Sequence, residues 1–125
     1  NGLVLMFAQL RTKEGAQVVD FGGTLAWPDG RQQALDQKDF SLTATGEWTS
    51  QYSGIVYPSG WQVDFPALKL QLQIDPLIQD QEMRVSFLYW EGAVKIAGTL
   101  DGEAVNGVGY VELTGYGQNS GEYQR

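Results

Sequence analysis

The stretch Leu68-Lys69-Leu70-Gln71-Leu72-Gln73-Ile74 decides the fold class of this chain. Four aliphatic side chains alternate with three polar ones, which is the two-residue period of a β-strand with one buried face. The same period continues in Met83-Arg84-Val85-Ser86-Phe87-Leu88-Tyr89, where Leu88 joins the otherwise polar face. The sequence therefore predicts strands rather than amphipathic helices.

Segments rich in β-branched and aromatic residues extend this pattern along the chain. Besides the two stretches above, we expect strands at residues 3–10, 18–27, 40–48, 59–65, 92–100 and 107–116, about eight in all. Turn signals with glycine or asparagine lie between them, at Lys13-Glu14-Gly15, Pro28-Asp29-Gly30, Leu100-Asp101-Gly102 and Val105-Asn106-Gly107. Residues 31–38 have a helical composition but are few and polar, so they support a single helical turn at most.

Successive antiparallel strands with short turns close most economically as an up-and-down barrel, because closure removes exposed strand edges. We therefore predict an all-β, antiparallel up-and-down barrel of about eight strands. A β-sandwich is the alternative, since strand number and spacing suit both folds. The 125 residues contain no linker or repeat, so we expect one domain over residues 1–125. An eight-stranded barrel has room for side chains or for one small ligand.

The composition excludes several classes of function. The chain has no cysteine and no histidine, which rules out thiolate nucleophiles, Ser-His-Asp triads and histidine-based zinc or haem sites. We predict neither a metal nor a cofactor. A net charge of −7 repels phosphate backbones, so nucleic acid is not an expected partner. No run of 18 apolar residues is present, and we expect no membrane span.

Three groups of residues go beyond general strand and turn patterns. They are Trp48-Thr49-Ser50 with Tyr57-Pro58-Ser59-Gly60-Trp61, Asp80-Gln81-Glu82 with Tyr89-Trp90-Glu91-Gly92-Ala93-Val94, and Gly107-Val108-Gly109-Tyr110-Val111-Glu112-Leu113-Thr114-Gly115-Tyr116. Together they resemble the lipocalin-like carboxy-terminal domain of the AttH-like and hydroxyneurosporene synthase proteins. These are bacterial chains often labelled predicted secreted hydrolases or carotenoid 1,2-hydratases. The resemblance covers nearly the whole chain.

The resemblance implies a lipocalin-like (calycin) barrel that is normally the second of two such domains in a longer, exported protein. It therefore implies a preceding lipocalin-like domain of the same parent chain as a partner, and a periplasmic or secreted location. Members of this family usually carry a further strand ahead of the position of Gly2. We accordingly expect the barrel of residues 1–125 to be incompletely closed.

Glu91 and Glu112 are the candidate catalytic residues. Hydration of a C=C bond needs an acid that protonates carbon, aromatic faces that stabilise the cation, and a base that activates water. Two carboxyl groups can do this without histidine. For Glu91 the structural alternative is a tight corner, in which Trp90 packs on the backbone of Gly92 and Glu91 lies at the surface.

The orientation of Glu112 depends on which face of its strand is buried. Tyr110 and Glu112 share one face, whereas Val111 and Leu113 share the other. If the two aliphatic residues face the core, which we favour, then Glu112 is solvated or lies against a partner domain. If Tyr110 and Glu112 point inward instead, the barrel contains a buried carboxyl beside a phenol, which suggests function.

Aromatic residues supply the candidate ligand-binding side chains. These are Trp48, Tyr57, Trp61, Tyr89, Trp90 and Tyr110. In the structural alternative, Trp48 and Trp61 plug one end of the barrel. Residues 51–56 between them are predicted to form a loop or a short hairpin.

Three functional hypotheses follow. The first is a module that binds a small hydrophobic molecule of isoprenoid or lipid type. The second is a carotenoid hydratase-like lyase, whose site is formed together with a partner domain and uses carboxylate acid and base residues. The third is a structural domain that braces that partner. An internal cavity of a few hundred Å³ with an aromatic lining would favour the first hypothesis over the third, and two carboxyl groups beside an aromatic lining are compatible with the second.

Overall fold

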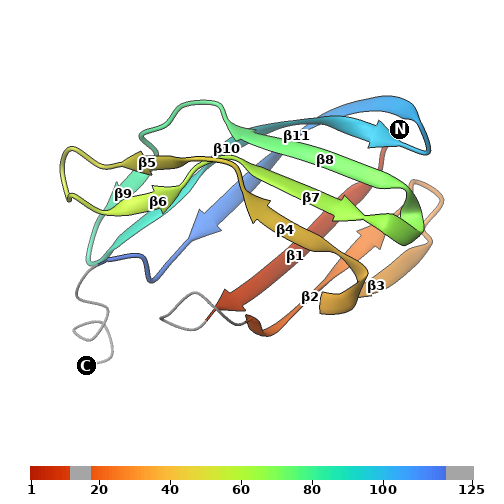
Figure 1. Cartoon of the computed structure of the whole chain (residues 1–125), viewed down its shortest axis with the longest axis horizontal. Coiled ribbons are helices and arrows are strands. Elements are labelled where there is room, and N and C mark those ends of the chain that lie inside the picture. The colour runs from red at the N-terminus through yellow and green to blue at the C-terminus, as the bar shows by residue number, and fades with distance from the viewer. Residues whose placement is uncertain (12–17, 118–125) are drawn as a thin grey trace.

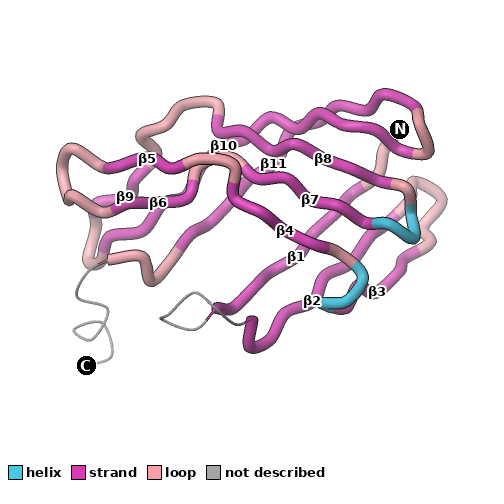
Figure 2. The backbone as a smooth tube through the Cα atoms, viewed as in Figure 1, coloured by secondary structure: helices cyan, strands magenta, loops and turns pink. Residues whose placement is uncertain are grey.

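A computed structural model describes residues 1–11 and 18–117 of the chain. Almost all regular structure in this part is β-strand, with two short 3-10 turns at 37–39 (η1) and 66–68 (η2) (Figure 2). The strands are β1 (Val4–Arg11), β2 (Val18–Ala26), β3 (Gln32–Asp36), β4 (Ser41–Ala44), β5 (Glu47–Thr49), β6 (Val56–Pro58), β7 (Trp61–Phe65), β8 (Leu70–Pro76), β9 (Glu82–Arg84), β10 (Leu88–Leu100) and β11 (Glu103–Leu113).

The strands form two main antiparallel sheets that curl around one interior (Figure 1). One sheet has the order β1-β2-β3, and the other has the order β11-β10-β8-β7-β4, with β9 paired to β10. The short hairpin β5–β6 lies beside β9 at one end of the molecule. This is the predicted all-β, lipocalin-like barrel, and it is incompletely closed.

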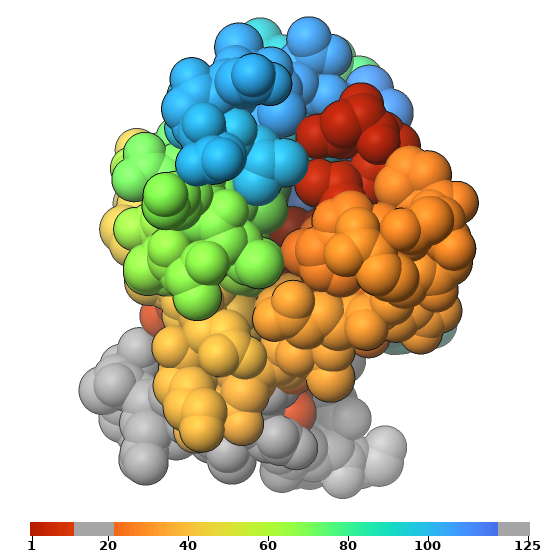
Figure 3. Space-filling view, turned by 90° about the vertical axis from the view of Figure 1, so that its right-hand side faces the viewer, coloured from red at the N-terminus to blue at the C-terminus, as the bar shows by residue number. Residues whose placement is uncertain are grey.

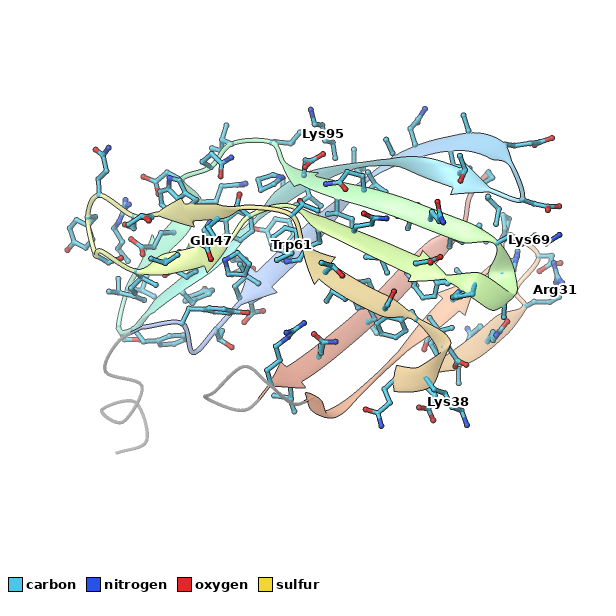
Figure 4. The ribbon with its side chains drawn as sticks, in the orientation of Figure 1. Arg31, Lys38, Glu47, Trp61, Lys69 and Lys95 are labelled. Carbon is cyan, nitrogen blue, oxygen red and sulfur yellow. The ribbon has the colours of Figure 1, made fainter. Side chains whose placement is uncertain are left out.

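The interior is filled by apolar side chains from both sheets. In β7 and β8 every second residue points inward, and Val63 lies opposite Leu72 in the ladder. The buried set comprises Leu25, Leu35, Phe40, Ile55, Tyr57, Trp61, Val63, Phe65, Leu70, Leu72, Ile74, Trp90, Val94 and Leu113. Figure 4 shows Trp61 between the sheets, whereas Lys38, Lys69 and Lys95 lie at the periphery. The alternation is therefore confirmed as that of a half-buried strand from Leu70 to Ile74, whereas Leu68 belongs to η2 and Lys69, with a φ of 50°, ends that turn.

The barrel is open where β1 meets β11. Each is the last strand of its sheet within the described residues, and no backbone ladder joins them; they face each other across the opening between the two sheets (Figure 1). We call this boundary the seam. Seen end on, the surface is indented between the two sheets (Figure 3). Several inward-facing apolar residues of the bordering strands are only partly buried: Leu5 and Phe7 in β1, and Val105 and Val111 in β11.

The tight turn at Asp101-Gly102 reverses the chain between β10 and β11. Both residues have positive φ, 51° and 83°, as the hairpin turn that matches strand twist requires. The turn predicted at 105–107 was wrong, because Asn106 and Gly107 continue β11 opposite Ala97 and Ile96. The turn at Pro28-Asp29-Gly30 is confirmed by the hydrogen bond from Gly30 N to Trp27 O, and the one at 13–15 lies outside the described residues.

The single helical turn allowed for residues 31–38 is confirmed, since η1 follows β3, which pairs with β2. Two predicted elements differ from those observed. The stretch 83–89 is not one strand, because residues 85–87 form a turn between β9 and the start of β10, which pair with each other. Residues 40–48 divide into β4 and β5, which join different partners. In each case pairing with a distant segment overrides local composition.

The close approach of β10 to β8 predicts which glycine in the long hairpin is irreplaceable. A Cβ at Gly98 would overlap the carbonyl oxygen of Gln71, whereas a Cβ at Gly107 would meet no atom within 4 Å. We expect Gly98→Ala to lower the free energy of unfolding by about 1–3 kcal/mol. Gly107→Ala should leave it unchanged or raise it slightly. Urea denaturation measures both, and equal effects of the two substitutions would contradict the described packing.

Candidate functional site

A buried carboxylate, Glu82 in β9, is the centre of the densest polar cluster in the described residues. Its side chain has no exposed surface, and each of its oxygens accepts two hydrogen bonds. Oε1 accepts from Ser50 Oγ at 2.8 Å and from Arg84 Nε at 3.1 Å. Oε2 accepts from Ser53 Oγ at 2.6 Å and from the Tyr57 hydroxyl at 2.9 Å. The four donors satisfy the charge that burial would otherwise penalise.

The two serines that bind Glu82 also shape the β5–β6 hairpin. Ser50 Oγ accepts from the backbone N–H of Tyr52 and of Ser53, both at 3.1 Å, and Ser53 Oγ accepts from Ile55 N. The backbone closes the turn through Ser50 N to Ile55 O. The prediction that residues 51–56 form a loop or short hairpin is thus confirmed. Glu82 and this turn hold each other in place.

At Glu82, burial and hydrogen bonding act on the pKa of the carboxyl in opposite directions. Burial raises the pKa of the Glu82 carboxyl. The hydrogen bonds from Ser53, Ser50, Tyr57 and Arg84 together lower it by more than burial raises it, so that the pKa lies below its ordinary value. The carboxyl is therefore ionised at neutral pH. Because all its strong acceptor positions are occupied, it is suited to bracing rather than to proton transfer.

The two residues before Glu82 make separate attachments. Both carboxylate oxygens of Asp80 accept a hydrogen bond from Nη2 of Arg84, each at 3.0 Å. The Gln81 side chain acts as a short piece of strand: it accepts from Ala93 N at 2.9 Å and donates to Ala93 O at 3.1 Å. The sequence Asp80-Gln81-Glu82 thus links β9 to itself, to β10 and to the hairpin.

Gly92 has a different role from the corner that we predicted. It lies inside β10, opposite Val111, and a Cβ there would overlap the Gln81 amide. Trp90, two residues earlier in β10, makes two recorded contacts. Its indole Nε1 donates to Gln79 O at 2.9 Å, and its ring meets that of Trp61 edge to face at a centroid distance of 6.3 Å.

The predicted ligand-binding aromatics divide into two groups on opposite sides of the sheet. Trp61, Trp90 and Tyr57 are buried in the core, and the half-buried Trp48 stacks on Tyr57 at 6.1 Å. Trp48 thus packs at the hairpin end of the barrel. The other two, Tyr89 and Tyr110, lie on the outer face of β10 and β11 with the predicted catalytic residues.

Glu91 and Glu112, the predicted catalytic pair, are direct cross-strand neighbours in the β10–β11 ladder. Both are on the outer face, with Leu113 and Val111 turned inward, which is the orientation that we favoured for Glu112. The Tyr89 hydroxyl is hydrogen-bonded to Glu91. This bond, then burial and the charges of Glu91 and Glu112, raise the pKa of Tyr89. The structure brings these residues together, but outside the barrel.

The two carboxylate groups differ in what they can do chemically. Glu82 is saturated with donors, whereas Glu91 and Glu112 keep free acceptor positions at the surface. A substrate that used Glu91 and Glu112 would have to lie against the outer face of β10 and β11. The described residues contain no group of three acidic side chains arranged to hold a metal ion, and no helix in them is long and apolar enough to cross a membrane.

Sequence reasoning did not assign Ser50, Ser53 and Arg84 to a site with Glu82. The serines were set aside because a serine nucleophile needs a histidine base. The available signal was the acidic motif Asp80-Gln81-Glu82, together with a turn that carries Ser50 and Ser53. Local sequence could not show that this turn, 29 to 32 residues away, folds back onto Glu82.

Comparisons with known proteins agree with this architecture. A sequence model of the family described as AttH-like matches residues 1–116. The search of curated proteins returned no match.

Two solved structures are similar over most of the chain. An AttH protein from Nitrosomonas europaea is 32% identical, with a TM-score of 0.78 over 93% of this chain and 35% of its own. Kievitone hydratase from Nectria haematococca is 15% identical, with a TM-score of 0.72 over 91% of this chain and 36% of its own. The second likeness concerns the fold alone. The chain spans about a third of the length of these two proteins.

The Glu82 cluster predicts a specific loss of stability. Glu82→Gln removes the charge that Arg84, Ser50 and Ser53 surround, and we expect the free energy of unfolding at pH 7 to fall by about 2–4 kcal/mol. The matched control Glu103→Gln changes an exposed glutamate in β11 and should alter it by less than about 0.5 kcal/mol. Chemical denaturation measures both values.

The pH dependence gives a second readout for the same variant. Because the folded-state pKa of Glu82 is lowered, its stabilisation is present above the unfolded-state pKa and is lost as the pH falls through the folded-state value. The difference between wild type and Glu82→Gln should therefore shrink below about pH 4. A difference that stays constant from pH 7 to pH 3 would contradict the ionised state of Glu82.

Proposed function

This chain belongs to the AttH-like family, and on that premise we propose that it binds a small hydrophobic molecule of isoprenoid or lipid type. The observation that carries this proposal is the seam. Along it, inward-facing apolar side chains such as Leu5, Phe7 and Val105 remain partly exposed. An apolar surface that the fold does not cover is favourably removed from water by an apolar ligand.

The chemistry of the seam suits a long, uncharged molecule better than a polar one. The inner positions of β11 next to the seam carry Val105 and Val111, and those of β1 carry leucine and phenylalanine. Gly109 lies between the two valines along β11, and a Cβ there would crowd Ile96 and Val94. The strip between Val105 and Val111 is therefore apolar and carries no large side chain at Gly109, a shape that suits an extended hydrocarbon.

The expected location of the protein agrees with this function but rests on the resemblance alone. We propose that the parent protein is exported to the periplasm or secreted. A preceding lipocalin-like domain in the same parent chain would account for the two thirds of the similar structures that this chain does not match.

A hydratase is the second candidate, and the pairing of Glu91 with Glu112 favours it. In a hydratase of this kind, one carboxyl would protonate the alkene carbon and the other would activate water. The similar fold of kievitone hydratase is in keeping with such chemistry. Since both carboxylates face outward, the reacting alkene would have to lie between this domain and a partner. If neither activity is present, the remaining role is to brace that partner.

Ligand binding predicts different effects for two adjacent substitutions in β11. Val105 faces the interior at the seam and Ala104 faces solvent. We expect Val105→Lys to weaken binding of the fluorescent probe N-phenyl-1-naphthylamine by about tenfold or more, because a charge enters the apolar strip. Ala104→Lys adds the same charge outside the barrel and should bind as wild type. Fluorescence titration of the full-length protein measures both affinities.

Circular dichroism and thermal unfolding establish that Val105→Lys is folded before its affinity is interpreted. If Val105→Lys and Ala104→Lys bind the probe with equal affinity, the seam is not the binding site. Failure of wild type to bind any apolar probe would leave the bracing role.

The hydratase candidate has its own test. Glu91→Gln and Glu112→Gln in the full-length protein should each reduce alkene hydration strongly, whereas Glu103→Gln should not, because an acid and a base are both required. Product formation measured by mass spectrometry, with incorporation of ¹⁸O from labelled water, reports the reaction directly. Unchanged turnover in both variants would exclude these carboxylates as acid and base.

A further inference from the structure

The outer face of the β10–β11 hairpin is an exposed surface of unusual composition. Its centre is the Glu91–Glu112 pair, and aromatic and aliphatic side chains lie on either side. We call this surface the carboxylate face; it consists of Phe87, Tyr89, Glu91, Val108, Tyr110 and Glu112. Val108 is 84% exposed and Tyr110 is 66% exposed. Val108 and Tyr110 lie on the same face of β11, two positions apart, so their exposed apolar surface adjoins the carboxylate pair.

The two carboxylates carry like charges at directly opposed positions, which destabilises an isolated sheet. Within the described residues no ion pair neutralises either of them. The nearest lysine along β10, Lys95, lies opposite Asp75 in β8 and opposite Val108 in β11. Lys95 projects from the outer surface in Figure 4. The described part of the domain, residues 1–11 and 18–117, therefore presents a local negative charge for which it provides no ion pair.

The other nearby cation is already engaged. Arg84 binds both Asp80 oxygens and Glu82, and its guanidinium lies 4.8 Å from the centroid of the Tyr52 ring. It is thus held at the hairpin end of the sheet. A cation for Glu91 and Glu112 must come from outside the described part of this domain.

The apolar members of the carboxylate face are arranged to receive a flat group. The rings of Phe87 and Tyr89 stack at a centroid distance of 4.9 Å. Tyr110 lies opposite Ala93, whose small side chain leaves the tyrosine ring uncovered. Aromatic faces beside paired carboxylates are the surroundings in which a guanidinium both stacks and donates two parallel hydrogen bonds.

We propose that the carboxylate face docks against the remaining part of the longer parent chain, and that this partner surface presents an arginine to Glu91 and Glu112. Two features on separate lines of evidence favour this occupant. No ion pair within the described residues compensates the negative charge of the face, and about two thirds of the length of the similar structures lies outside the matched region. A partner in the same chain is present at high effective concentration, so a modest interface is enough to keep the two parts together.

Hydroxyl-radical footprinting of the full-length protein tests the proposal, because it measures the solvent access of individual side chains. Tyr52 is the internal control, since it is 70% exposed in this domain and lies on the β5–β6 hairpin, away from the carboxylate face. We expect Tyr110 to be oxidised several-fold more slowly than Tyr52. Glu112→Lys should return the oxidation rate of Tyr110 to that of Tyr52, whereas Glu103→Lys should leave it protected.

Each other outcome overturns a stated part of the proposal. Equal oxidation of Tyr110 and Tyr52 in wild type means that the face is open to solvent. Protection that increases with protein concentration identifies a second copy as the occupant. Protection that survives both Glu112→Lys and Glu91→Lys means that no cation binds there. The wild-type comparison does not depend on any variant folding. It is also independent of ligand binding at the seam, which lies on the inner side of β11.

Discussion

Two curved sheets have to bury one shared apolar interior although hydrogen bonds join them along neither side. On one side the chain itself crosses from β3 to β4 through η1, and Phe40 enters the core at that crossing. On the other side, at the seam, the described residues provide no such connection. The inward-facing residues of β7 and the aliphatic ones of β8 are buried, whereas Leu5, Phe7 and Val105 beside the seam are only partly buried. Part of the accessible inward-facing apolar surface thus lies between β1 and β11.

The polar interactions stabilise the end of the barrel where the strands are shortest. The hairpin β5–β6 has only three residues in each strand, too few for independent stability. It is held by the ionised Glu82, by the stacking of Trp48 on Tyr57, and by the contact of Tyr57 with Tyr116 at 6.1 Å. A saturated carboxylate thus fixes one end of the half-barrel, and the opposite sheet edge is left unpaired.

The fold class was predictable because strand periodicity is a local property. Residues 68–74 and 92–100 alternate strongly enough to identify buried and exposed faces, and the orientation of Glu112 followed from Val111 and Leu113. Splitting of the 83–89 stretch was not predictable, because it depends on pairing between β9 and β10. The turn predicted at Asn106-Gly107 was wrong because the chain already reverses at Asp101-Gly102, and residues 106 and 107 continue β11. Local turn propensity does not decide between two nearby candidates.

The candidate site was only partly predictable. Glu91 and Glu112 were identified as a pair, and their direct opposition depends on the register of an eleven-residue ladder that sequence patterns do not specify. Glu82 was noted only as part of a motif, because its partners Ser50, Ser53 and Tyr57 come from a distant hairpin. Gly92 is explained by the Gln81 side chain, a contact made through tertiary structure. Sequence thus identified residue types with chemical potential, and topology decided which of them meet.

Native mass spectrometry of the full-length protein, purified from its host under mild conditions, tests most directly whether the seam holds an apolar ligand. The account predicts a stoichiometric adduct that is released into organic solvent and identified as an uncharged molecule of isoprenoid or lipid type. Only the bare protein mass, found repeatedly in independent preparations and after incubation with such molecules, would contradict it.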